Sequence, residues 1–214
     1  MRRILFLAAI AAVALLGANC TSPTGPIYPM TVGSVWNMST TTLYGTTGAS
    51  LDTWSTSTQT ITAQVETTLA NGKEVTKFKN EETIRDRKPD TATVGQTGYC
   101  YVAEVGDSVL TYVNPSDTTG TTIMRSTPAV GQTWSEGSAA TATVVDQEDV
   151  TVAAGTYKGA WKVKVSTTMA DFPAPVDIYK WYARGTGLVK DSFDFSAMGN
   201  EESYSSELTS ATIK

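Results

Sequence analysis

Residues 60–72 read Thr-Ile-Thr-Ala-Gln-Val-Glu-Thr-Thr-Leu-Ala-Asn-Gly. Apolar or small side chains alternate with polar ones, and the first set comprises Ile61, Ala63, Val65, Thr67 and Leu69. Alternation with period two predicts a half-buried β-strand, because successive side chains point to opposite faces. Asn71-Gly72 is the dipeptide most suited to a type I′ turn, in which both central residues need positive φ. The stretch therefore predicts a hairpin that returns through residues 74–87.

The same alternation recurs along the rest of the chain. Short turns are expected at Gly106-Asp107, at residues 153–155 and at residues 184–187. The further expected strands are Tyr99–Val105, Val109–Val113, Ala140–Val152, Tyr157–Val165, Ile178–Ala183, Leu188–Phe195 and Tyr204–Ile213. About ten strands with hairpin-length connections predict an all-β fold: a single antiparallel, meander-like curved sheet that forms a half-barrel or barrel. Longer loops at residues 88–96 and 170–176 are the expected rim or lid.

Residues 29–36 and residues 128–134 echo one another. Both segments read Val-Gly-x-x-Trp shortly after a proline. Proline and glycine favour a turn, and the tryptophan is expected to enter the core on the strand that follows. On its own the echo is too short to define a repeated domain.

Composition supports a β-rich fold and excludes several classes of function. Of the 214 residues, 41% are hydrophobic and only 17% are charged, and threonine and serine fill the difference. The chain has no histidine, which removes Ser-His-Asp and Cys-His catalysis and every metal site that needs imidazole. Without Arg2 and Arg3, 14 basic and 21 acidic side chains leave a formal charge of −7, which disfavours nucleic acid and anionic lipid as partners. We expect no cofactor and no enzymatic activity.

The first 19 residues predict export. Met1-Arg2-Arg3 supplies a short positive segment, and residues 4–16 form a nearly unbroken apolar run. As a helix this run would be about 20 Å long, shorter than the roughly 30 Å hydrocarbon core of a bilayer. We therefore expect a cleaved signal peptide at residues 1–19, a flexible tether at residues 20–27 and a single β domain at residues 28–214.

Cys20 directly follows the apolar run and the small residues Gly17 and Ala18, an arrangement that resembles a lipobox. A lipobox usually has leucine three positions before the cysteine and a small residue directly before it, whereas these positions here hold Gly17 and Asn19. We expect Cys20 to carry a lipid that anchors the domain to a membrane. Because Thr21 is not acidic, the expected location is the outer membrane of a bacterial cell envelope, facing the periplasm or the cell surface.

Two alternatives remain open at this N-terminus. Ordinary signal cleavage, for example after Ala18, would leave Cys20 unmodified, and a disulfide with Cys100 would then be possible in an oxidising compartment. An uncleaved membrane anchor is the second alternative. If Cys20 is acylated, we expect Cys100 to be a small packed residue, because no histidine or lysine adjoins it to lower its pKa.

Acidic and aromatic side chains are the remaining candidates for a site. The acidic groups are Asp146-Glu148-Asp149, Asp191-Asp194 and Glu201-Glu202. They could supply a glycosidase pair or a calcium site, but nothing in the sequence fixes their spacing, so solvated charge is the expectation. Trp36, Trp134, Trp161 and Trp181 occupy apolar-phase positions and are expected in the core. Trp54, amid serine and threonine, is expected to face water.

Three segments together resemble the TapB-like envelope lipoproteins of unknown function. The segments are residues 28–36, which include Tyr-Pro-Met-Thr-Val-Gly-Ser-Val-Trp, residues 150–157 and residues 181–190, which read Trp-Tyr-Ala-Arg-Gly-Thr-Gly-Leu-Val-Lys. The resemblance implies a curved antiparallel sheet or half-barrel, distantly like the periplasmic carriers that hold the acyl chains of lipoproteins in an apolar cavity. It implies no catalytic residues.

Three functions are therefore compatible with the sequence. The first is a lipid-anchored, non-enzymatic β-module of the cell envelope that is structural or binds an apolar ligand or a protein. The second is a surface protein that binds carbohydrate or mediates adhesion. The third is a hydrolase that uses carboxylates alone. A continuous apolar cavity above about 300 Å³ would favour the ligand-binding function. A solvent-facing row that contains Trp54 and another aromatic residue would favour carbohydrate binding, and two carboxylates about 5 to 9 Å apart in one cleft would favour hydrolysis.

Overall fold

The computed structural model describes residues 25–86, 94–168, 175–197 and 199–214. The expected signal peptide, Cys20 and most of the expected tether lie outside these residues, as do the centres of the two longer loops. The strands are β1 (Val35–Thr46), β2 (Asp52–Thr68), β3 (Glu74–Asp86), β4 (Val94–Val105), β5 (Ser108–Tyr112), β6 (Thr121–Arg125), β7 (Thr133–Ser135), β8 (Ala140–Val152), β9 (Gly155–Thr167), β10 (Val176–Ala183), β11 (Gly187–Ala197) and β12 (Asn200–Thr212). No helix in these ranges is long and apolar enough to cross a bilayer.

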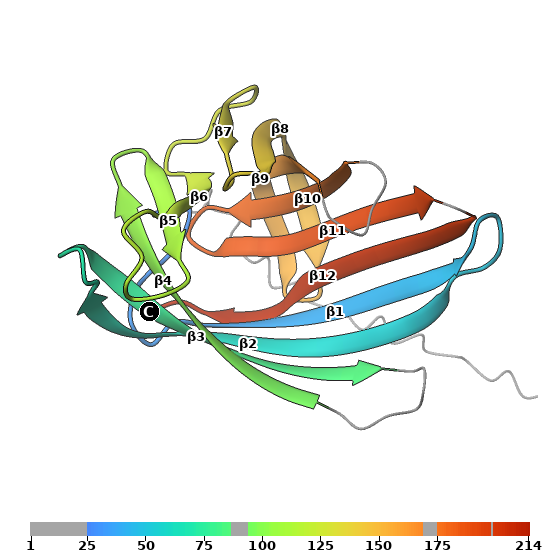
Figure 1. Ribbon diagram of the computed structural model, residues 1–214, viewed down its shortest axis with the longest axis horizontal. Helices are drawn as coiled ribbons and strands as arrows, with labels where there is room; N and C mark the ends of the chain where they lie inside the picture. Colours follow the sequence, from blue (N-terminus) through green and yellow to red (C-terminus); the bar gives the residue numbers. More distant parts are fainter. Residues whose placement is uncertain (1–24, 87–93, 169–174, 198) are drawn as a thin grey trace, which may run out of the picture.

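All twelve strands belong to one antiparallel sheet in the order β6-β5-β4-β3-β2-β1-β12-β11-β10-β9-β8-β7 (Figure 1). Every chain-consecutive pair is adjacent except β6 and β7, and the first strand pairs with the last. The sheet therefore curls into a nearly closed barrel with one seam between β6 and β7. The expected all-β meander is confirmed, and the short strands β6 and β7 bring the count to twelve instead of about ten.

The sequence echo marks two equivalent turns. Gly33 N donates to Ala63 O at 2.8 Å, and Gly131 N donates to Val144 O at 2.8 Å. Both glycines have a φ of 87°, a value that favours glycine, and in each segment a buried tryptophan follows three residues after the glycine. Six strands follow each turn in meander order, so the barrel consists of two halves of six strands each. The halves meet in a full ladder at β1–β12 and in the seam at β6–β7.

Side chains bridge the seam where the backbone ladder is missing. The indole of Trp134 on β7 donates a 3.2 Å hydrogen bond to Thr122 O on β6. The Arg125 guanidinium lies 5.9 Å from the centre of the Trp134 ring. From across the interior, the Tyr182 hydroxyl donates to Ile123 O at 3.4 Å. These contacts cover two strand edges that would otherwise be open to pairing with another chain.

The opening stretch of the sequence forms the expected hairpin, with two departures in detail. A β-bulge at Gln64 shifts the register between β2 and β3, so the expected shared face of Ala63 and Val65 is wrong. Ala63 is buried, whereas Val65 is 48% exposed. The turn is also wrong in type: Gly72 N donates to Leu69 O and Leu69 N donates to Lys73 O, which gives a three-residue loop instead of a two-residue one.

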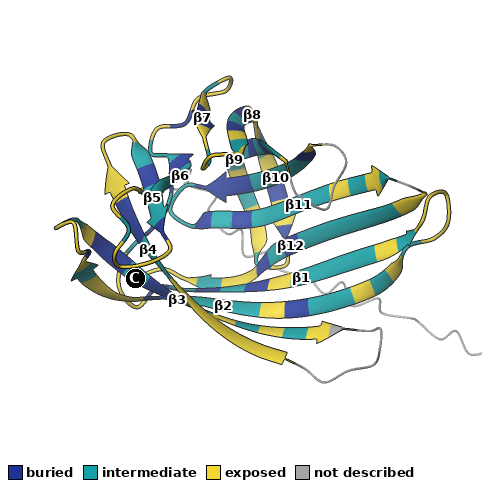
Figure 2. Ribbon diagram, viewed as in Figure 1, coloured by how far each residue is buried: buried dark blue, intermediate teal, exposed yellow. Residues whose placement is uncertain are grey.

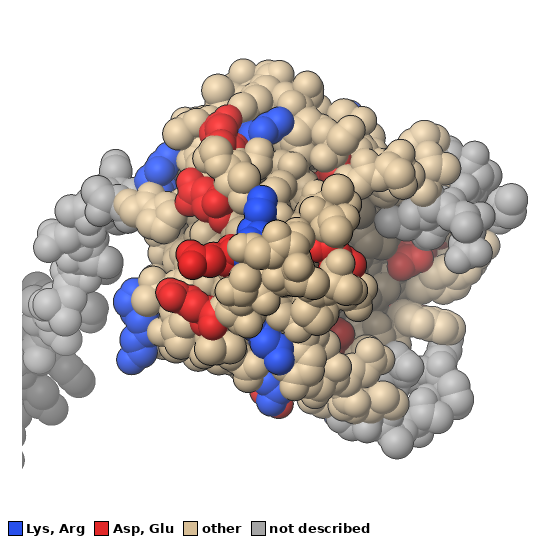
Figure 3. Space-filling view, turned by 60° about the vertical axis from the view of Figure 1, so that its left-hand side comes forward, with Lys and Arg blue, Asp and Glu red and all other residues tan. Residues whose placement is uncertain are grey.

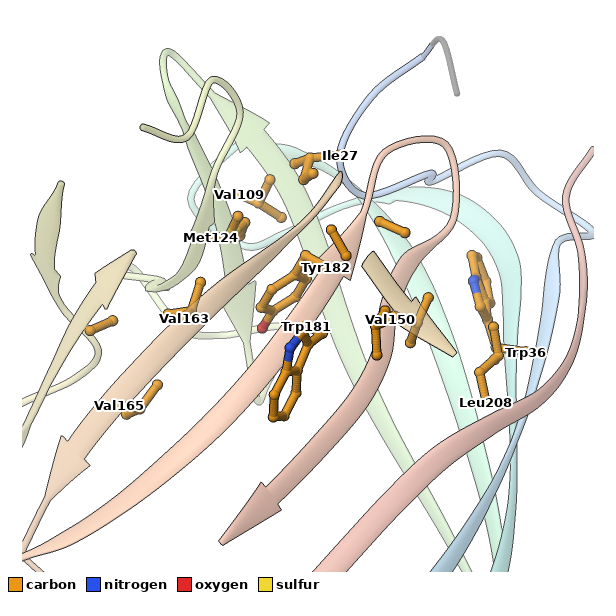
Figure 4. Packing of buried hydrophobic residues seen from close by; sticks show 14 of the residues in the cluster. Ile27, Trp36, Val109, Met124, Val150, Val163, Val165, Trp181, Tyr182 and Leu208 are labelled. Atoms are coloured by element: carbon orange, nitrogen blue, oxygen red, sulfur yellow. The ribbon is translucent and has the colours of Figure 1, made fainter. Parts of the chain in front are cut away.

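The main hydrophobic core lies at one end of the barrel, here called the core end, where the β2–β3, β4–β5 and β10–β11 turns gather (Figures 1 and 2). Figure 4 shows Ile27 of the N-terminal segment, Met124, Tyr182 and Trp36 converging there from distant parts of the chain. Toward the opposite end, here called the open end, β1, β2, β11 and β12 run on with half-buried and exposed residues. The open end carries the β1–β2 and β11–β12 turns.

Candidate functional site

The inward face of the open half is lined by hydroxyl groups. On β1 the buried Trp36 and Met38 are followed at alternate positions by Thr40 and Thr42. Residues directly opposite each other in an antiparallel ladder share a face. The β2 partners of Met38, Thr40 and Thr42 are Gln59, Ser57 and Ser55, and the β12 partners of Thr40 and Thr42 are Ser206 and Tyr204. The threonine and serine bias of the sequence thus extends into the interior of the barrel.

A cavity of about 200 Å³ lies where this polar face meets the core, so it is smaller and more polar than the apolar ligand cavity that the sequence expectation described. Its lining combines hydrocarbon and polar groups: Tyr28, Trp36, Met38, Gln59, Ile61, Leu188, Asp191, Tyr204 and Ser206. The N-terminal segment closes the cavity toward the core end, because the Tyr28 ring contacts Phe78 at 6.1 Å between ring centres. The Trp36 indole donates a 2.6 Å hydrogen bond to Thr186 O in the β10–β11 turn and so fixes this wall.

Asp191 is the one carboxylate that the described residues contribute to the lining of this cavity. Burial raises the pKa of its carboxyl to about 6, against the opposing effects of the nearby Lys180 charge and of hydrogen bonds from Ser206 and Tyr204. Lys180 itself is paired with Glu136, with 2.5 Å between Nζ and Oε1. An ionisable group that is penalised by burial and still borders a cavity is characteristic of binding and catalytic sites.

A second hollow, here called the mouth, adjoins the cavity at the open end. It has a volume of about 370 Å³ and is lined by Thr42, Tyr44, Trp54 and Glu202. The Tyr44 and Trp54 rings are 5.6 Å apart between centres and tilted by 57°. Both remain exposed, at 41% and 42%, so the prediction that Trp54 faces water is confirmed.

The ladder pairing of β1 with β12 joins the cavity and the mouth into one inner surface. The cavity and the mouth together are here called the hollow. Thr42 of the mouth is the ladder partner of Tyr204, which lines the cavity, and Tyr44 is the partner of Glu202. On the neighbouring strand the Phe193 ring stacks on Tyr204, with ring centres 5.2 Å apart and planes within 10°. Aromatic and polar groups therefore alternate from the rim of the barrel down to Asp191.

A third concave surface lies at the core end. This open groove of about 720 Å³ is bordered by the N-terminal segment and by the ends of β2, β3 and β4, and its charged residues are Glu66, Glu74 and Glu104. No group of three or more cysteine, aspartate or glutamate residues in the described part of the chain is arranged to hold a metal ion.

Two of the other candidate acidic residues, Asp149 and Glu148, take part in surface ion pairs. Asp149 accepts hydrogen bonds from Lys158 Nζ at 2.6 Å and from Gly159 N at 3.0 Å. Glu148 accepts a 2.7 Å hydrogen bond from the Trp181 indole, which lowers the pKa of its carboxyl. On the face that Figure 3 shows, basic and acidic side chains lie near one another. Asp191 differs from the expected solvated charge, because it borders the interior cavity.

The cysteines and the remaining tryptophans can also be set against the sequence expectations. Cys100 pairs with Phe78 and packs against the core, and burial raises the pKa of its thiol. Its expected role as a packed residue without a lowered pKa is confirmed. Trp36, Trp134 and Trp181 are buried as expected, and the half-buried Trp161 packs against the same core. Cys20 lies outside the described residues, so its lipidation stays a prediction.

Asp191 was expected among the solvated acidic residues, although the sequence carries a signal for its interior position. It alternates with Val189 and Phe193, so it occupies an apolar-phase position of its strand. Lys180 has the same kind of position between Ile178 and Tyr182. A charged residue in the apolar phase of a strand indicates either a buried ion pair or an interior site.

Solved structures of two other bacterial proteins align with the structure of this chain. A protein of Bacteroides fragilis that is assigned to the exported proteins and has a YmcC-like fold aligns with a TM-score of 0.50 and 14% identity, covering 88% of this chain and 100% of its own. A protein of Parabacteroides distasonis that is assigned to the lipoproteins aligns with a TM-score of 0.40 and 14% identity, covering 88% of this chain and 99% of its own. No family model and no curated protein matches the chain, so the resemblance to TapB-like lipoproteins stays a prediction. What the first likeness shows is that this chain shares the fold of the YmcC-like exported protein.

Proposed function

We propose that this chain is a lipid-anchored, non-enzymatic module of the bacterial cell envelope that binds a small amphipathic molecule in the hollow of its open half. The observation that carries the proposal is the cavity of about 200 Å³ in which the Asp191 carboxylate lies beside hydrocarbon from Trp36 and Met38. Ligand sites combine an apolar lining with a few placed polar groups, and this cavity has that composition.

A purely structural barrel would not need such an interior. Apolar side chains would fill the same space without the desolvation of a carboxylate. The mouth offers a way in, because its two aromatic rings remain exposed next to the cavity. Catalysis is not part of the proposal, because the described residues that line the cavity and the mouth include a single carboxylate in each case.

The position of the N-terminus supports an anchor that leaves the mouth accessible. Gly25 O accepts a 3.1 Å hydrogen bond from Arg184, so the chain enters the barrel at the core end, beside the β10–β11 turn. Gly25 comes five positions after Cys20, and this stretch of chain spans at most about 18 Å. A lipid on Cys20 would therefore hold the core end near the membrane and the mouth away from it.

Metabolic labelling with a palmitate analogue tests the anchor. We expect the wild-type chain to incorporate the label and to fractionate with membranes. Cys20→Ala should lose the label and appear in the soluble fraction, because the thiol that accepts the lipid is gone. Equal labelling of the two chains would contradict lipidation at Cys20.

Calorimetric titration of the mature chain carrying Cys20→Ala tests the binding function. The probes are 2-phenylethanol, phenethylamine and phenylacetate, which share a ring and differ in charge. At least one should bind with a dissociation constant of about 1 mM or tighter, which a ligand of this size can reach. Gln59→Phe should abolish the binding because Gln59 lines the cavity.

Thr58→Phe is the matched control, because Thr58 is the exposed neighbour of Gln59 on the other face of β2. It should bind the probes like the parent chain. Absence of heat with all three probes, or an equal effect of Gln59→Phe and Thr58→Phe, would contradict binding in the hollow.

Carbohydrate binding is the second candidate, and the exposed Tyr44–Trp54 pair favours it. The 57° tilt between the rings leaves no flat platform, so a single sugar ring against Trp54 is the geometry that fits. Affinity electrophoresis through gels that contain soluble glycans is the test. Retardation that disappears in Trp54→Ala would support a sugar site, and unchanged mobility of the parent chain in every glycan would exclude it.

A further inference from the structure

The charges that face the cavity are predominantly negative. Asp191 on β11 faces Lys180 and Tyr182 of β10, Tyr204 of β12 and Glu136 of the β7–β8 connection. Glu82 of β3, the ladder partner of Gln59, acts on Tyr204 from the other side, and Tyr28 closes the cavity. Lys180 is held in an ion pair with Glu136, and within the described part of the chain no basic side chain forms an ion pair with the Asp191 carboxylate.

The mouth has a matching chemistry. Glu202 lies beside Tyr44 and Trp54, and the faces of such rings attract cations. Asp52, the β2 partner of Tyr44, adds a further acidic residue at the rim. A positively charged molecule would therefore be attracted at the rim and again at the bottom of the hollow, whereas an anion would be repelled at both.

The apolar part of the cavity wall determines which chemical group can be attached to the positive charge of the ligand. Trp36, Met38 and Ile61 present hydrocarbon, and the volume of about 200 Å³ suits a group of the size of one substituted ring or a short branched chain. A hydrated inorganic ion would leave this apolar surface unused. The lining instead suits a charge that is attached to an apolar group.

We propose that the hollow selects an organic cation, a protonated amine or quaternary ammonium that carries a small apolar group, with Asp191 as its counter-ion. The proposal rests on the binding function proposed above and names the class of its ligand. The ammonium group lies beside Asp191, and the apolar group lies against Trp36 and Met38. The aromatic pair at the mouth holds the cation as it enters.

Binding of this kind is coupled to the protonation of Asp191. The cation needs the ionised carboxylate, whose pKa of about 6 leaves it mostly charged at neutral pH and neutral at pH 4. Affinity for a cation should therefore be constant above about pH 7 and fall roughly tenfold for each pH unit below 6. A neutral probe should show no such dependence.

The test compares matched probes by calorimetry on the mature chain with Cys20→Ala. At pH 7.5 phenethylamine should bind at least about tenfold more tightly than its neutral analogue 2-phenylethanol, and phenylacetate should not bind. Asp191→Asn should reduce phenethylamine affinity to that of 2-phenylethanol and remove the pH dependence. Asp194→Asn, an exposed carboxylate on the same strand, should change neither.

Each outcome separates the two proposals. Equal or tighter binding of 2-phenylethanol, or an unchanged affinity for phenethylamine in Asp191→Asn, would overturn the cation while leaving the binding function intact. Absence of binding by all three probes would overturn both. Circular dichroism of Asp191→Asn establishes that the variant is folded, and retained 2-phenylethanol binding shows that its cavity is intact.

Discussion

Replacing Phe78 by alanine is expected to lower the free energy of unfolding by about 3–5 kcal/mol, the range for a large buried aromatic. Phe78 is 1% exposed, and its ring lies 5.8 Å from Trp36 and 6.1 Å from Tyr28 between centres. It therefore joins β1, β3 and the N-terminal segment into one core. Urea unfolding at neutral pH, followed by tryptophan fluorescence, measures the change.

Val65→Ala is the control for this prediction, because simple alternation from Ala63 would bury Val65 in the same core. The bulge at Gln64 instead leaves Val65 48% exposed. Its replacement should cost less than about 1 kcal/mol, mostly through a lower β propensity. A loss of several kcal/mol at Val65, or a loss below about 1 kcal/mol at Phe78, would mean that the register described for β2 and β3 is incorrect.

Asp191→Asn is expected to stabilise the fold at neutral pH, by at most about 3 kcal/mol. The pKa of this carboxyl rises from 3.8 to about 6 on folding because of burial. Between these values the unfolded chain releases the proton first, so the contribution of Asp191 to the free energy of unfolding falls as pH rises from about 4 to 6. Asparagine cannot ionise, so the variant lacks the desolvation cost of a buried charge.

The measurement is the difference in unfolding free energy between Asp191→Asn and the parent chain at pH 4 and pH 7.5. The difference should be small at pH 4 and favour the variant at pH 7.5. Carboxylates whose pKa values are lowered, including Asp149 and Glu148, are present in both chains. Their contribution to the pH dependence of the unfolding free energy therefore cancels in this difference. A destabilised Asp191→Asn at pH 7.5 would contradict the described burial of this charge.

The strands and hairpins could be predicted from the sequence because they depend on local patterns. Alternation located most strands, and Gly106-Asp107 marked a turn that the structure confirms, with a φ of 59° at Gly106. The β-bulge at Gln64 could not be predicted from such local patterns. A bulge inserts one residue into a ladder, and only the partner strand reveals that the register has shifted.

The site was harder to predict because its residues come from strands far apart in the sequence. Trp36 and Asp191 border the same cavity only because β1 pairs with β12, the last strand of the chain. Periodicity assigns a residue to a face of its own strand but not to a partner strand. The apolar-phase position of Asp191 was visible in the sequence, yet its meaning depended on that closure.

Fluorine NMR of the mature chain, with 5-fluorotryptophan at all five tryptophans, tests binding in the hollow most directly. Trp36 borders the cavity and Trp54 borders the mouth, whereas Trp134 lies at the seam. Titration with phenethylamine should shift the signals of Trp36 and Trp54 in a saturable manner and leave that of Trp134 unchanged. Saturable binding that leaves both Trp36 and Trp54 unmoved, or shifts only Trp134, would contradict a ligand site in the open half of the barrel.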